Sequence, residues 1–239
     1  MKFSFAIEKW FGLSSGLATH SDWQVWANDI NHDWSLPIAK PTKIPMMQAR
    51  RMSIPSRLAV EVGLHLLDEQ SIDFAIFVSR HGELERTYKI LTTLNQNTDI
   101  SPTDFALSVH NTAAGLFTII AKNPIPLTSI AAGQDSFQQA LIEAQSLFNQ
   151  GFKRILLIDF DGAIPDIYQP EVNALIPAYA CGFILTAGQE LMVSAIENEV
   201  TLYQAHYPQS LAFLHAYLNK QHVFNLQGNL QNWQWIINR

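Results

Sequence analysis

One short run of residues limits the fold of this chain more than any other feature. Residues 153–160 read KRILLIDF, and the unbroken apolar stretch at their centre predicts a strand buried on both faces. Further apolar runs lie at 73–79, 127–132, 181–187 and 191–196. Segments with helical spacing of apolar residues lie at 57–69, 83–96, 108–121, 135–149 and 208–220. Buried strands separated by amphipathic helices predict an α/β fold with a largely buried mixed sheet and helices on both faces, in one domain over residues 1–239.

The two ends of the chain are less regular than its centre. Residues 1–55 are rich in Trp and Pro, which predicts an irregular arm with a short opening strand at Phe3–Ile7. The core is expected over 56–200. Residues 201–239 form a divergent tail, in which 222–237 is expected to supply one or two final strands.

Composition excludes several classes of protein. Charged residues make up 15% of the chain and hydrophobic residues 48%, with a net charge of −6. This balance argues against disorder and against nucleic acid as the main partner. The single cysteine, Cys181, excludes a disulfide scaffold and a cysteine-based zinc site. No apolar run reaches the ~18–20 residues of a membrane span, and Glu8 and Lys9 interrupt the first apolar patch, so a cytoplasmic location is expected.

Most common motifs of cofactor and catalytic sites are absent from the sequence. It contains no GxGxxG, P-loop, HExxH or CxxC pattern, and the eight histidines include no pair at the i, i+4 spacing of metal ligands. We therefore expect neither a cofactor nor a metal. The sequence Asp159-Phe160-Asp161-Gly162 is interpreted as a polar turn, with a magnesium site or an acid–base pair as the alternative.

One long segment is more specific. Ile100-Ser101-Pro102 leads to Asn111 and Gly115, and a long helix follows that ends at Gly151 before the apolar strand. This order resembles the N-terminal half of the β-ketoacyl synthases, which have the thiolase fold, and the resemblance covers roughly residues 45–190. It implies half of a thiolase-like fold.

The resemblance also places the family's nucleophilic cysteine. Counting forward from Asn111 and backward from Gly151 leads to the same position, which is occupied by Gln134. A thiolate at a helix N-terminus is a strong nucleophile, whereas a carboxamide cannot form an acyl-enzyme. In the structural interpretation, Gln134 only starts a helix. In the functional interpretation, its side chain fills the acyl site that the cysteine occupies in the family.

The family's catalytic histidines have no counterpart here. His206, His215 and His222 match none of the family's histidine motifs. A glutamine in place of the cysteine is similar to the chain length factors of type II polyketide synthases. The segments 50–51, 79–83, 86–87 and 108–111 resemble a short group of these proteins from aryl polyene clusters of Gram-negative bacteria. That resemblance implies a non-catalytic subunit that pairs with an active ketosynthase, works with an acyl carrier protein and shapes the acyl tunnel.

In the thiolase fold, the strand before the nucleophile helix pairs across the subunit interface. Here that strand is 127–132, which contains Ile130, and an open edge of this kind must be paired or covered. The resemblance gives as tunnel or interface candidates Gln134, Phe105, His110, Asn111, Phe117, Leu84, Thr87, Tyr88 and Ile130. For each aromatic residue plain core packing is the alternative, and for His110 a structural hydrogen bond.

Two other functions stay open at this stage. The chain could be a stand-alone decarboxylase or thioesterase acting on carrier-protein substrates, with His110 as the catalytic group and Gln134 as an oxyanion donor. It could also be an assembly protein with no role in the tunnel.

Overall fold

The computed structural model describes residues 1–29, 31–67, 71–172, 177–197, 201–203, 206–229 and 231–238. The strands are β1 (Lys2–Ser14), β2 (Phe74–Val78), β3 (Leu127–Ile130), β4 (Arg154–Asp161), β5 (Tyr179–Ile196), β6 (Val223–Leu226) and β7 (Asn232–Ile237). The α-helices are α1 (His20–Asn28), α2 (Met46–Ala49), α3 (Ile54–Leu67), α4 (Leu84–Asn95), α5 (Pro102–Ala106), α6 (Thr112–Ala121), α7 (Ser136–Asn149) and α8 (Gln209–Leu218). Two 3₁₀ turns, η1 (Gly133–Asp135) and η2 (Asp166–Glu171), follow β3 and β4.

These strands form one mixed sheet. Its order is β3-β2-β4-β5-β7-β6, and β1 pairs along the other side of β5. β2 is parallel to both β3 and β4, and the remaining pairs are antiparallel. Every residue of β4 from 155 to 161 is buried, as the apolar run predicted. The α/β class and the mixed sheet are therefore confirmed.

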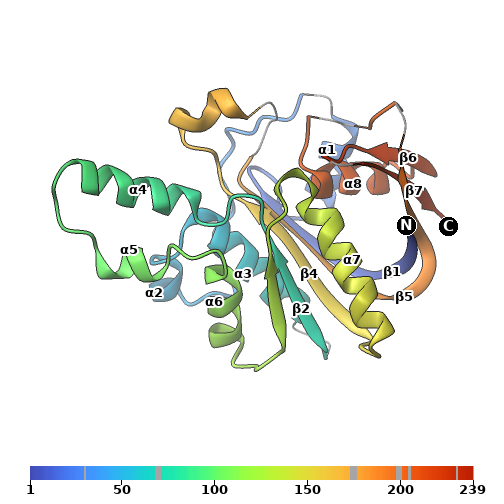
Figure 1. The fold of residues 1–239 in the computed structure, drawn as a ribbon, viewed down its shortest axis with the longest axis horizontal. Coiled ribbons are helices and arrows are strands. Elements are labelled where there is room, and N and C mark those ends of the chain that lie inside the picture. Colours follow the sequence, from blue (N-terminus) through green and yellow to red (C-terminus); the bar gives the residue numbers. More distant parts are fainter. Residues whose placement is uncertain are drawn as a thin grey trace.

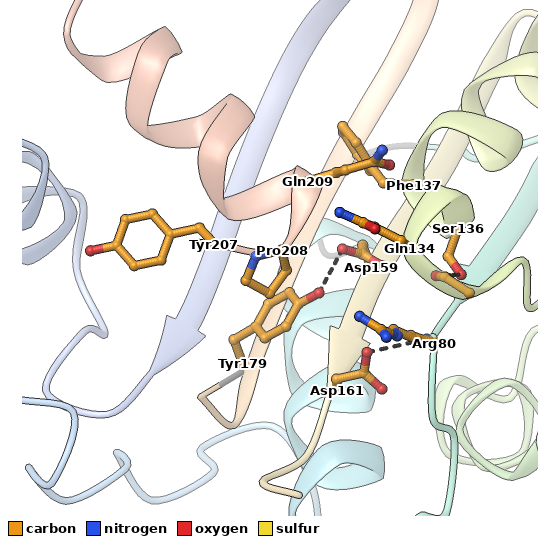
Figure 2. Close-up of a pocket in the computed structure, with 11 residues that line it drawn as sticks. Arg80, Gln134, Ser136, Phe137, Asp159, Asp161, Tyr179, Tyr207, Pro208 and Gln209 are labelled. Carbon is orange, nitrogen blue, oxygen red and sulfur yellow. Dashed lines mark hydrogen bonds between the residues drawn. The ribbon is translucent and has the colours of Figure 1, made fainter. Parts of the chain in front are cut away.

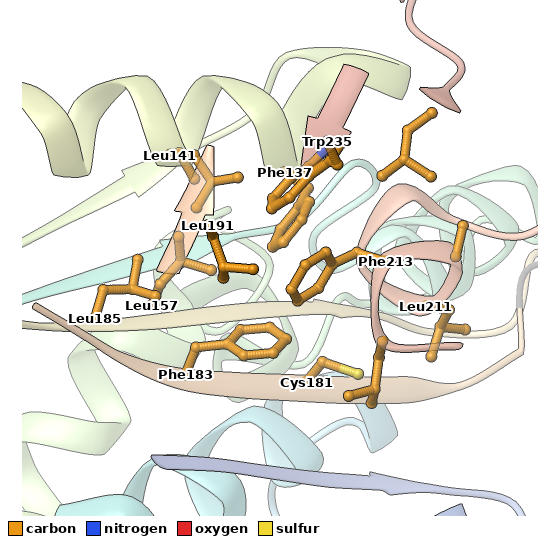
Figure 3. Close-up of a cluster of buried hydrophobic side chains, with 14 of the residues drawn as sticks. Phe137, Leu141, Leu157, Cys181, Phe183, Leu185, Leu191, Leu211, Phe213 and Trp235 are labelled. Carbon is orange, nitrogen blue, oxygen red and sulfur yellow. The ribbon is translucent and has the colours of Figure 1, made fainter. Parts of the chain in front are cut away.

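Helices cover both faces of the sheet (Figure 1). On one face α3 and α6 enclose a cluster that includes Val62, Phe117 and Leu156. On the other, α7 and α8 enclose a larger cluster that also contains residues of β5 and β7. In this second cluster Phe137, Phe213 and Trp235 pack together, with ring centroids 4.5 to 6.2 Å apart (Figure 3). The tail thus supplies much of the apolar cover over α7.

The N-terminal segment is more regular than predicted. β1 runs for 13 residues instead of five and pairs with β5 along its length. The helix α1 was not predicted, although Thr19 and Asp22 form a capping box at its start. Prolines were taken as a sign of irregular structure, but all of them lie beyond α1 in this segment. The tryptophans of α1 pack inward, and Trp23 Nε1 donates to the Gly12 carbonyl (2.9 Å).

The boundaries of several other elements also differ from those predicted. The runs at 181–187 and 191–196 belong to one strand, β5, because Ala187–Glu190 continue the extended backbone between them. The helix predicted over 108–121 begins only at Thr112, as α6, and residues 108–111 form a turn before it. The predicted helix end at 68–69 lies outside the described residues. The expected final strands are present as β6 and β7.

Candidate functional site

Gln134 lies in the turn between β3 and α7. Gly133 adopts a φ of +58°, a conformation that favours glycine, and this allows the sharp turn. Ser136 Oγ donates to the Gly133 carbonyl (2.7 Å) and accepts from the Ala132 amide (3.0 Å), which fixes the turn. The half-buried side chain of Gln134 is therefore held at the N-terminus of a 14-residue helix.

A small polar cavity adjoins Gln134. Its walls come from the loop after β2, the start of α7, the ends of β4 and β5, and the start of α8 (Figure 2). Its volume is about 40 Å³, which is room for about three or four water molecules at ~10–15 Å³ each. An acyl chain does not fit inside it. The lining residues are Arg80, Gly133, Gln134, Ser136, Phe137, Asp159, Asp161, Tyr179, Tyr207, Pro208 and Gln209, so no cysteine or histidine of the described chain lines it.

The two aspartates of this cavity lie within a strand. Asp159 and Asp161 are both in β4 and both buried, so the predicted polar turn was wrong. β4 continues through them because Tyr179 and Cys181 of β5 pair opposite. Residues two apart in a strand share a face, which brings both carboxyl groups to one end of the sheet.

Asp159 is the more perturbed carboxyl group. Tyr179 Oη donates to its Oδ2 (2.8 Å), and Ser210 Oγ of α8 donates to the same atom. Burial raises the pKa of Asp159 to about 7, the neighbouring Asp161 adds to the rise, and the hydrogen bond from Ser210 opposes it. Near neutral pH this carboxyl group is therefore protonated in a large share of the molecules.

Asp161 organises the loop that follows β2. Its carboxylate accepts from Ser79 Oγ (2.7 Å) and from the amides of Arg80 (3.1 Å) and His81 (3.0 Å). These backbone donors show that Asp161 serves as a structural acceptor. Among the described residues no group of three or more His, Cys, Asp or Glu side chains is placed to hold a metal ion.

The same loop leads into a helical arm formed by α4 and α5, which projects from the body of the molecule (Figure 1). Glu83 is buried, accepts from Ser53 Oγ (2.8 Å) and Ser56 Oγ, and pairs with Arg86 (3.2 Å). Arg86 also pairs with Asp104 of α5 (2.6 Å). The Ser79–Glu83 segment therefore fixes the arm.

His110 has a backbone partner. Its Nε2 lies 3.0 Å from the Ser79 carbonyl oxygen, and since a carbonyl only accepts, Nε2 carries the proton. Its ring also lies close to Gly82, whose φ of +56° and lack of a side chain make room for it. His110 does not line the cavity beside Gln134, and this favours a structural role. Asn111 precedes α6 without a side-chain cap.

The other predicted tunnel residues lie in different environments. Phe117 is fully buried and packs against Phe77, with ring centroids 5.3 Å apart, so it belongs to the core. Phe105 is 68% exposed. Tyr88 and Thr87 are exposed on α4, and Leu84 and Ile130 are half-buried. Of the predicted site residues, only Gln134 lines the small cavity.

Of the remaining reactive side chains, Cys181 and His215 are buried and His222 is exposed. Cys181 lies inside β5, where burial raises the pKa of its thiol well above the usual value. His215 Nδ1 lies 2.7 Å from Tyr203 Oη, and its ring packs edge-on against Trp26. Burial also lowers the pKa of His215. His222 faces a backbone carbonyl at 3.4 Å.

Sequence reasoning missed most of the cavity. Arg80, Tyr179, Tyr207 and Gln209 were not singled out as one site, because they come from three distant segments. Asp159 and Asp161 were noted but assigned to a turn. An available signal was the apolar run at 211–218, directly after position 209, which predicts a buried helix and hence contact with the core.

Comparison with known proteins agrees with this architecture. Residues 23–236 match the model of the beta-ketoacyl synthase N-terminal domain. A chain in the structure of the ketosynthase ApeO in complex with its chain length factor ApeC, from Xenorhabdus doucetiae, is 39% identical. The match covers 98% of this chain and 99% of that one, with a TM-score of 0.91. No curated protein matches.

More distant structures share the fold. The ishigamide ketosynthase/chain length factor is 18% identical over 84% of this chain and 69% of that one, with a TM-score of 0.64. A beta-ketoacyl synthase from Burkholderia phymatum is 15% identical over 93% and 71%, with a TM-score of 0.58.

The fold and the start of α7 define a ketosynthase-like protein with a glutamine in the turn before the helix. The chain belongs to the β-ketoacyl synthase family, through its N-terminal domain. None of its described helices is long and apolar enough to cross a membrane.

Proposed function

We propose that this chain is a chain length factor of polyene biosynthesis. In this role it lacks a nucleophile, pairs in the cytoplasm with an active β-ketoacyl-ACP synthase, and forms part of the tunnel that holds the growing acyl chain. The partner supplies the cysteine and histidines, and an acyl carrier protein delivers the acyl and malonyl groups.

The position of Gln134 carries this proposal. It stands at the N-terminus of α7, where the helix dipole would stabilise a thiolate. A carboxamide there cannot form an acyl-enzyme, because the lone pair of its nitrogen is delocalised into the carbonyl group. The cavity that adjoins Gln134, about 40 Å³ in volume, is too small for an acyl chain. An acyl chain that lies beside Gln134 would therefore run along a surface shared with another subunit.

The edge of the sheet supports the same conclusion. β3 is at one end of the strand order and pairs only with β2 among the described strands. It carries no charged residue, and such an edge is expected to be paired or covered in the working protein. Phe105 and Ile119, 68% and 67% exposed, belong to α5 and α6, the two helices that precede β3 in the chain.

Co-expression with a ketosynthase encoded beside this chain tests the pairing. We expect a one-to-one complex on size-exclusion chromatography, with condensation of malonyl units only when both chains are present. A chain that is monodisperse alone, together with a ketosynthase that neither binds it nor needs it, would overturn the proposal. Turnover of malonyl-carrier protein by the purified chain alone would instead favour the stand-alone enzyme.

The tunnel role has its own test. Replacing Phe105 or Tyr88 with alanine is expected to lengthen the polyene product, because each change removes an exposed bulky side chain that the partner complex can enclose. Thr98→Ala, in the exposed loop before α5, is the control. Product length measured by mass spectrometry that stays unchanged in both variants would leave the chain as an assembly subunit without a tunnel role.

A further inference from the structure

The helix α4 carries an apolar stripe that has little contact with the rest of the described chain. Leu84, Tyr88, Leu91 and Leu94 follow one another at spacings of four, three and three residues, so they lie on one side of the helix. Leu91 and Leu94 are each 50% exposed and Tyr88 is 36% exposed. No residue of α4 is buried.

The exposure of the stripe does not arise because α4 is loosely held; ion pairs fix this helix to α5. Arg86 and Lys89 both bind Asp104 of α5, at 2.6 and 2.7 Å, and Arg86 also binds the buried Glu83. Arg86 and Lys89 lie on the side of α4 that faces α5, roughly opposite Leu91 at ~100° per residue. The ion pairs therefore fix α4 in an orientation that turns the stripe away from α5.

The stripe is connected to the candidate site. It begins at Leu84, directly after the Ser79–Glu83 loop, whose Arg80 lines the cavity beside Gln134. Tyr88 contacts Tyr168 of η2, with ring centroids 6.2 Å apart, and the neighbouring Ile167 is 63% exposed. An apolar strip therefore extends from the loop at the cavity along the projecting arm.

The strand β3 alone is too small to form a stable interface with a partner subunit. β3 has four residues and spans about 13 Å at ~3.3 Å per residue. A stable interface buries roughly 800 Å² on each partner, and one short strand cannot supply that area. Other apolar surface must take part, and α4 offers it on a rigid support.

We infer that the stripe formed by Leu84, Tyr88, Leu91 and Leu94 is a second contact surface for the ketosynthase partner, in addition to the β3 edge. This inference rests on the proposed function. The matching surface on the partner is apolar, because the stripe presents no charged group of its own between residues 84 and 94 on that side of the helix.

The double variant Leu91→Glu/Leu94→Glu tests the inference. It places two charges on the stripe while leaving Arg86, Lys89 and Asp104 in place. The matched control is Thr93→Glu/Gln96→Glu, which adds the same charge near the same end of α4 but on the side away from Leu91. Affinity for the co-expressed ketosynthase is measured by calorimetry, and hydrogen exchange reports protection of α4. Thermal melting of each free variant verifies that it folds.

We expect the stripe variant to bind at least tenfold more weakly, the control to bind within threefold of wild type, and α4 amides to become protected in the wild-type complex. Equal binding by both variants, with α4 unprotected, overturns the inference and leaves the proposed function intact. Failure of the wild-type chain to bind any ketosynthase overturns the proposed function. Loss of self-association with unchanged ketosynthase binding assigns the stripe to a second copy of this chain and also overturns the inference.

Discussion

The two sides of the helix α7 have different surroundings. On one side the tail covers it: Phe213 and Trp235 are 1% and 0% exposed and pack against Phe137. On the other side lie the β3 edge and the arm, where Phe105 is 68% exposed. The chain thus supplies its own core over one side and leaves apolar groups uncovered on the other. The low proportion of charged residues in the chain applies to both sides of α7, but only the uncovered side needs a partner.

Paired phenylalanine variants give the largest expected contrast. Phe213→Ala removes a ring that contacts Phe137, Phe183 and Trp235 and should lower the free energy of unfolding by about 3–5 kcal/mol. Phe105→Ala removes an exposed ring and should change it by less than about 0.5 kcal/mol. Urea unfolding of the free chain measures both. Similar losses in the two variants would show that the tail does not form a core of its own.

Proline in β3 tests the open edge. The amides of Ala75 and Ser79 donate to the carbonyls of Pro126 and Ile130, so the alternation of a parallel ladder points the Ser129 amide away from β2. Ser129→Pro should therefore keep the fold and weaken ketosynthase binding at least thirtyfold, about 2 kcal/mol. Ser129→Ala is the control, since it also removes the hydroxyl but keeps the N–H group. Unchanged binding by the proline variant would place the interface elsewhere.

Much of the contrast was visible in the sequence, for physical reasons. The run at 153–160 and the spacing 100–151 depend on local pattern, which a sequence displays directly. The length of β1 could not be predicted in the same way, because its regularity depends on pairing with β5, far along the chain. The capping box at Thr19 was a local signal that the prolines downstream obscured.

The cavity beside Gln134 was less predictable than the fold. Asp159 reads as part of an Asp-Gly turn until β5 is placed opposite it. Its partners Tyr179 and Ser210 lie 20 and 51 residues away, and no local pattern links them. The position of Gln134 itself was predictable because a fixed spacing leads to it from both directions.

The covered side also contains a group that makes stability depend on pH. The folded-state pKa of Asp159, about 7, lies above the unfolded value near 3.8, so the folded protein binds the proton more tightly. The contribution of Asp159 to the free energy of unfolding is then fully present below pH ~4 and is lost as the pH rises through 7. Asp159→Asn keeps an acceptor for Tyr179 and Ser210 and should flatten this loss, by on the order of 1–3 kcal/mol between pH 5 and 8.5.

Chemical denaturation across this pH range measures the effect. Asp99→Asn, which neutralises an exposed carboxylate in the loop before α5, is the control and should retain the slope of the wild type. If Asp159→Asn retains that slope as well, the buried carboxyl group titrates at its ordinary value, and the hydrogen bonds from Tyr179 and Ser210 outweigh its burial.

The smallest expected effect separates Gln134 from its neighbour. Asp135 accepts from the Asn229 amide (2.9 Å) and from Gln209 Nε2 (3.3 Å), so it joins the tail to the start of α7. Asp135→Ala should therefore cost about 1–3 kcal/mol, because buried donors lose their acceptor. Gln134→Ala should change stability by less than about 0.5 kcal/mol, since its side chain is half-exposed at the boundary between the covered and uncovered sides. Thermal unfolding of the free chain compares the two, and a loss at Gln134 as large as that at Asp135 would make the glutamine a structural residue of the helix start.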